Sequence, residues 1–219
     1  MISAQNLPYN STIPAMLITK EECSQLLSRY EDALTSRIEG HKQKNRAQNL
    51  LELDRWRLTE LRHAVQARDP SYMTLSELSK LMDCKLYFPV VSMFTRSRGT
   101  FRPRLKQLIE NNSDKNVKEI TEGGFLSTKT NDEEHIVQAN LRAIKLLCEL
   151  QGVGPATATM ILQAKYDNVP FMSDEAMLQV FEGDKRKLKY DLRTCGDFMR
   201  EVEEIRKKLS NGILIGNRE

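Results

Sequence analysis

One stretch decides how this sequence is interpreted: Leu150-Gln151-Gly152-Val153-Gly154-Pro155-Ala156-Thr157-Ala158. Two glycines flank a valine, and a proline follows the second glycine. Glycine lets the backbone turn tightly and leaves no Cβ in the way of a close approach. Proline suits the first turn of a helix, because its missing N–H would have no partner there. The stretch therefore predicts two helices joined by a tight turn, with Val153 packed between them.

The turn is also a candidate binding site for one phosphate. Backbone N–H groups that point outward at the start of a helix favour an anion, and the helix dipole adds to the effect. Such a contact positions a protein on a nucleic-acid backbone without reading its sequence. The alternative interpretation is a plain turn between two packed helices. The residues expected to contact nucleic acid here are Gly152, Val153, Gly154 and Thr157.

The residues around this turn resemble the helix-hairpin-helix (HhH-GPD) DNA glycosylase superfamily. In that family the hairpin is followed by a helix, a return loop and an aspartate at the mouth of the base pocket. Here Asp174 follows Gly154 by twenty positions (174 − 154), and the residues between them read like the family's helix and loop. The resemblance covers residues 130–181 and implies a helical DNA-glycosylase-like domain that binds double-stranded DNA.

The resemblance leaves open whether the chain removes a base from DNA. In active members the aspartate stabilises the positive charge that develops on the sugar of a flipped-out nucleotide. The resemblance makes Asp174 the candidate catalytic residue, although Ser173 or Asp174 could instead cap a helix. Members that also cleave the strand carry a lysine where this chain has Ala156. Any activity is therefore expected to be monofunctional, without lyase chemistry.

A second candidate DNA contact is the basic segment 96–106, which holds five cations in eleven residues. Arginine can grip a phosphate with two hydrogen bonds. A solvated surface loop is the alternative interpretation, and the same alternative applies to the charge run at 185–189. The arginines expected to contact DNA are Arg96, Arg98, Arg102 and Arg104.

Helical periodicity dominates the remaining sequence and predicts an all-α fold. Capping boxes at 19–22, 74–77 and 130–133 predict helix starts, and the pair Gly123-Gly124 predicts a helix end. Only residues 87–93 resemble a strand. We expect an N-terminal arm and helix over residues 1–45, the helical domain over 46–210 with its hairpin at 150–158, and a C-terminal tail over 211–219.

Composition narrows the functional classes. Hydrophobic residues make up 40% and charged residues 29% of the 219 residues, as in ordinary globular proteins. The net charge of +3 is too small to indicate a polyanionic partner by itself. No apolar run is long enough to span a membrane, and residues 1–15 lack the pattern of a secretory signal. An intracellular location is expected, and a nuclear one follows only from a DNA ligand.

Neither a metal nor another cofactor is expected. The four cysteines are far apart in the sequence, which argues against a zinc ribbon or the iron–sulfur cluster of some glycosylases and favours free thiols. The three histidines are isolated from carboxylate pairs at ligand spacing. Three functions stay open: a DNA-binding glycosylase, a catalytically inactive module that binds DNA structure or abasic sites, and a helical protein-interaction subunit.

Overall fold

The computed structural model describes residues 19–39, 44–91, 103–128, 135–184 and 188–210. Within these ranges every regular element is a helix, which confirms the all-α class. In this part of the chain no helix combines the length and the apolar character needed to cross a membrane. The helices are α1 (Lys20–Ser28), α2 (Tyr30–Glu39), α3 (Lys44–Leu58), α4 (Glu60–Gln66), α5 (Leu75–Val91), α6 (Pro103–Glu110), α7 (Asp114–Ser127), α8 (Ile136–Leu147), α9 (Pro155–Gln163), α10 (Asp174–Val180) and α11 (Leu192–Ser210).

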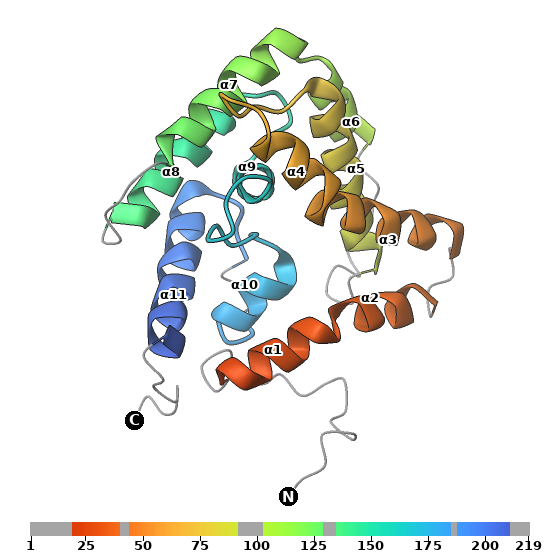
Figure 1. Cartoon of the computed structure of the whole chain (residues 1–219), viewed down its shortest axis with the longest axis vertical. Coiled ribbons are helices and arrows are strands. Elements are labelled where there is room, and N and C mark those ends of the chain that lie inside the picture. Colours follow the sequence, from red (N-terminus) through yellow and green to blue (C-terminus); the bar gives the residue numbers. More distant parts are fainter. Residues whose placement is uncertain (1–18, 40–43, 92–102, 129–134, 185–187, 211–219) are drawn as a thin grey trace, which may run out of the picture.

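Helix α9 lies at the centre of the molecule and is seen nearly end-on in Figure 1. Its residues 156–162 are all buried. A helix that is buried on every side must be apolar or small all round, and α9 begins Pro-Ala-Thr-Ala-Thr before its larger apolar residues. The Thr159 hydroxyl donates to the Ala156 carbonyl oxygen (3.0 Å) and accepts from the Met172 N–H (3.1 Å). The helix after the turn is therefore anchored in the core from its first residues.

Helices α7 and α8 pack closely because of two glycines. Gly123 and Gly124 lie inside α7, so the predicted helix end at this pair is wrong. A Cβ on Gly124 would lie 2.9 Å from Leu147 Cδ2, and one on Gly123 would lie 3.0 Å from Leu146 Cδ2. The missing side chains let α8 approach α7, and this packing keeps the glycines in a helix that their propensity disfavours.

Helix α5 starts as predicted but is longer than its sequence indicates. Glu77 N–H donates to Thr74 Oγ1 (3.2 Å), and Thr74 N–H donates to Glu77 Oε2 (2.9 Å), which confirms the capping box. The helix continues to Val91, so the strand expected over 87–93 is helical through residue 91, and its last two residues lie outside the described part. The first part of α5 is fixed by the burial of Leu78, Leu81 and Cys84. Each residue added to a helix that is already formed gains one backbone hydrogen bond, which outweighs the weak, context-dependent β propensity of this run.

The N-terminal helices are only partly as expected. The capping box of Thr19 and Glu22 is present, with bonds of 3.1 and 2.8 Å. The chain then breaks at Arg29 into two helices, and no residue of α1 is buried. Leu27 of α1 has 77% of its surface exposed. Among the described side chains of α2, which end at residue 36, Leu34 is the one that joins the hydrophobic core, and α2 packs against α3.

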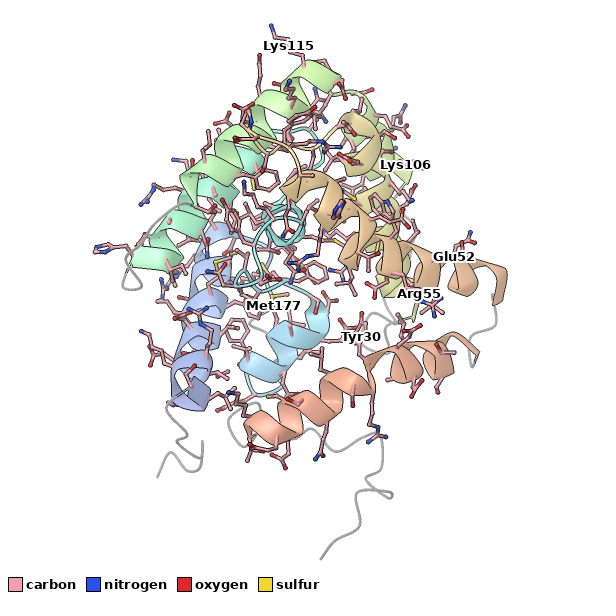
Figure 2. All side chains as sticks on the ribbon, in the orientation of Figure 1. Tyr30, Glu52, Arg55, Lys106, Lys115 and Met177 are labelled. Atoms are coloured by element: carbon pink, nitrogen blue, oxygen red, sulfur yellow. The ribbon has the colours of Figure 1, made fainter. Side chains whose placement is uncertain are left out.

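A buried polar network fastens α2 to the core. Asp54 of α3 is 2% exposed, and its Oδ1 accepts from Arg57 Nη2 (2.7 Å) and Nε (3.1 Å). Tyr30 donates its hydroxyl to Asp54 Oδ2 (3.0 Å), while Arg57 Nη1 donates to Gln163 Oε1 of α9 (3.1 Å). Figure 2 shows Tyr30 and Arg55 where α2 meets α3, and Arg55 pairs there with Glu31. The network joins α2, α3 and α9.

Candidate nucleic-acid interface

The candidate interface is the turn between α8 and α9. Helix α8 ends at Leu147, and Pro155 is the first residue of α9, as its type predicts. Val153 is 7% exposed and belongs to the hydrophobic core, which confirms that this residue packs inward. Its N–H donates to the Leu150 carbonyl oxygen (3.1 Å). Leu150 of the same turn is 1% exposed and also belongs to the core, so two buried apolar residues hold the turn on its inner side.

The two glycines of the turn face different surroundings. Gly152 has a φ of +78°, and a Cβ there would lie 3.1 Å from Leu105 O and 3.2 Å from both Leu108 Cβ and Ile109 Cγ1, all on α6. Gly154 has a φ of −111° and a ψ of 177°, and a Cβ there would meet nothing within 4 Å. Of the two, only Gly154 offers the open approach expected of a contact to an external ligand, whereas Gly152 is a packing position.

The hydrogen bonds at the start of α9 show which backbone N–H groups are left for a ligand. Gly154 is the N-cap, and its carbonyl oxygen accepts from the N–H groups of Thr157 and Ala158, both at 2.9 Å. No acceptor within the described ranges takes the N–H of Gly154 or of Ala156. A helix of nine residues leaves such groups at its first turn for water, a side chain or a ligand. An anion at this turn would meet both the groups and the helix dipole.

Thr157 points into the protein rather than outward. Its side chain is buried, and its Oγ1 accepts from Lys85 Nζ of α5 at 2.5 Å. The hydroxyl is therefore already used within the fold. Any contribution of Thr157 to a nucleic-acid contact would come through its place in the first turn of α9, not through its side chain.

Of the four arginines expected to contact DNA, the described residues include only Arg104. Arg96, Arg98 and Arg102 lie outside them. Arg104 is exposed on α6, the helix against which Gly152 packs, and within the described ranges it has no ion-pair partner. Its neighbour Lys106, labelled in Figure 2, is paired with Asp83 at 2.9 Å. A cation therefore lies on the helix that borders the turn.

Asp174 is the first residue of α10 and is half-buried. Ser173 is the N-cap, and its hydroxyl accepts from the Ala176 N–H (3.1 Å), so the helix cap expected here is formed by Ser173. The Asp174 carboxylate accepts instead from the hydroxyl of Tyr190, which precedes α11. Sequence reasoning missed Tyr190, because sixteen residues separate the pair and no periodic pattern joins them. The Met172–Thr159 bond described above ties the loop before Asp174 to α9.

The lysine of strand-cleaving glycosylases has no counterpart at the expected position. Ala156 is buried there. The next lysine along α9 and its end is Lys165, whose Nζ donates to Ser71 Oγ (2.6 Å) and lies 5.9 and 5.8 Å from the rings of Phe125 and Tyr166. Lys165 is thus held against α7 and the segment before α5.

Metal and thiol chemistry find little support among the described residues. They contain no cluster of three or more His, Cys, Asp or Glu side chains that could hold a metal ion. The four cysteines are free thiols. Burial raises the pKa of the Cys84 and Cys195 thiols to about 12 and that of Cys148 to about 11. These three are therefore protonated near neutral pH and poor nucleophiles.

Comparisons of the chain with models of known protein families, with curated proteins and with solved structures give no match. The resemblance to the DNA glycosylase superfamily therefore stays a prediction that rests on the residues of the turn and on Asp174.

Proposed function

We propose that this protein binds the backbone of double-stranded DNA through the turn between α8 and α9. The observation that carries the proposal is the setting of Gly154. This residue caps a helix that is buried along its length, and it faces open space. Backbone N–H groups at such a place bind phosphate without requiring a particular base. A rigid, core-anchored helix start loses little freedom when it binds, which favours affinity.

Charge near the turn supports the same proposal. Arg104 lies next to Leu105, the residue whose carbonyl oxygen faces Gly152. An arginine close to a backbone anion site adds a charge-assisted contact to a second phosphate oxygen. Phosphate contacts release counterions, so the affinity should fall as salt rises. A nuclear location belongs to this proposal, because it follows from the ligand alone.

The test is the affinity of two Gly154 variants for a labelled duplex, measured by fluorescence anisotropy at several salt concentrations. Asp and Asn have nearly the same shape, and both are good N-cap residues, so Gly154→Asp and Gly154→Asn should fold like the wild type. The Asn variant should bind about tenfold more weakly because its side chain blocks the approach. The Asp variant should bind about a hundredfold more weakly, because its carboxylate also repels the phosphate.

The comparison of the two variants separates charge from shape. Equal affinities of wild type, Asn and Asp variants would remove the turn from the DNA contact. A wild-type chain without any salt-dependent affinity for the duplex would contradict DNA binding altogether. That result would favour the third function, a helical protein-interaction subunit.

Base removal by Asp174, as in base excision repair, is the second proposal. It is supported by the bond between Met172 and Thr159, which fixes the loop before Asp174 to the helix that begins at Gly154. The partial exposure of Asp174 and its hydrogen bond from Tyr190 weigh against it, because a carboxylate stabilises an oxocarbenium ion best in a water-excluded site. Binding without catalysis is therefore the function supported best.

A duplex with a stable abasic-site analogue tests the second proposal. If a pocket beside Asp174 receives an extruded nucleotide, this duplex should bind about tenfold more tightly than the intact one, because less unstacking is needed. Asp174→Asn should then keep the preference and abolish any release of a base. Equal affinity for the two duplexes would contradict a pocket and leave only backbone binding.

A further inference from the structure

The turn between α6 and α7 contains a buried asparagine with an unusual set of bonds. Asn112 is 6% exposed. Its Nδ2 donates to three carbonyl oxygens, those of Ile109 (2.8 Å), Gln151 (3.1 Å) and Leu108 (3.2 Å). Its Oδ1 accepts from the Gln151 N–H (3.0 Å). The side chain therefore binds the end of α6 and both polar backbone groups of one residue in the α8–α9 turn.

This arrangement specifies a carboxamide. The pairing with Gln151 needs an N–H donor and an oxygen acceptor side by side, as in a pair of strands. Aspartate has the shape but no donor, and leucine has neither group. Buried polar groups that lose their partners carry a free-energy cost, so the backbone of Gln151 is held firmly only while residue 112 is asparagine.

The same turn rests on α6 one residue later. Gly152 lies so close to Leu105, Leu108 and Ile109 that a Cβ would come within 3.2 Å of each of them. The hydrogen bonds of Asn112 and this packing together join α6 and the turn at two adjacent residues. Gly154 follows two residues after Gly152, and Arg104 precedes the contact on α6. The open glycine and the exposed arginine are thus on two segments that are fastened to each other.

We infer that Asn112 is a positioning residue that holds the α8–α9 turn against α6. It thereby fixes, before binding, the conformation of the site that is proposed to bind the DNA backbone. The inference rests on the proposed DNA binding. Asn112 touches no ligand itself. It removes the freedom that the turn would otherwise lose on binding, which raises affinity without adding a contact.

The experiment compares Asn112→Asp with a matched variant, Thr121→Val. Thr121 is also buried, and its hydroxyl accepts from Met73 N–H (2.9 Å) and donates to Val117 O (2.7 Å), bonds that do not involve the turn. Both variants should unfold at lower urea concentration. Only Asn112→Asp should accelerate amide hydrogen exchange at residues 151–154, by about tenfold or more, and weaken duplex binding by about tenfold. Asn112→Ser, which introduces no charge, serves the same purpose if the Asp variant does not fold.

The outcomes distinguish this inference from the proposed function. Unchanged exchange at residues 151–154 in the Asn112 variants would overturn the inference, as would faster exchange with unchanged affinity. Equal losses of affinity in Asn112→Asp and Thr121→Val would also overturn it, because general destabilisation would then explain both. A wild-type chain that does not bind the duplex would overturn the proposed function and, with it, the presetting of a site. In that case the exchange rates would still establish whether Asn112 holds the turn.

Discussion

Replacement of Asp54 by alanine is expected to lower the free energy of unfolding by about 3–5 kcal/mol, since it leaves a buried guanidinium without its counter-ion. Arg57 is nearly as buried as Asp54, and two of its nitrogens donate to the same carboxylate oxygen. The loss should appear as a lower midpoint of urea unfolding with an unchanged slope.

Two further variants show what the loss is due to. Tyr30→Phe removes only the hydrogen bond to Asp54 Oδ2 and should cost about 1 kcal/mol. The double variant Asp54→Leu with Arg57→Met should recover much of the stability, because a buried ion pair can be replaced by apolar residues of similar volume. If Asp54→Ala cost no more than Tyr30→Phe, the ion pair would not be what holds α2, α3 and α9 together.

Local features of this fold could be predicted from the sequence. The capping boxes at Thr19 and Thr74 and the place of Pro155 each depend on residues within four positions of one another. Such contacts form inside a single turn, so the order of residue types is enough to indicate them. The burial of Val153 followed from the same kind of reasoning.

Contacts between distant segments could not be predicted. Nothing within the local sequence around Asn112 indicates that its amide pairs with Gln151, thirty-nine residues later. The same holds for Tyr190 and Asp174. For Gly123 and Gly124 the prediction from the local sequence is wrong. Glycines commonly end helices, but these two lie inside α7 and allow α8 to approach it. A residue type fixes what the backbone can do, and the packing partner decides which of these possibilities is used.

The two glycines of the α8–α9 turn should respond differently to substitution. Gly152→Val is expected to lower the free energy of unfolding by about 2–4 kcal/mol, from the strain of a β-branched residue at positive φ and from overpacking. The overpacking is severe because one of the close atoms, Leu105 O, belongs to the backbone of α6 and cannot rotate away. Gly154→Asn should change stability by less than about 0.5 kcal/mol, since its Cβ enters open space and asparagine is a good N-cap.

Urea unfolding of the two variants, with circular dichroism as the signal, measures this difference. Equal and small losses would show that the turn does not rest on α6, and the positioning role of Asn112 would lose its structural basis. With the expected difference, a loss of DNA binding in Gly152→Val would reflect damage to the fold. Only Gly154, where a side chain can be added without disturbing the protein, allows the proposed phosphate contact to be tested by itself.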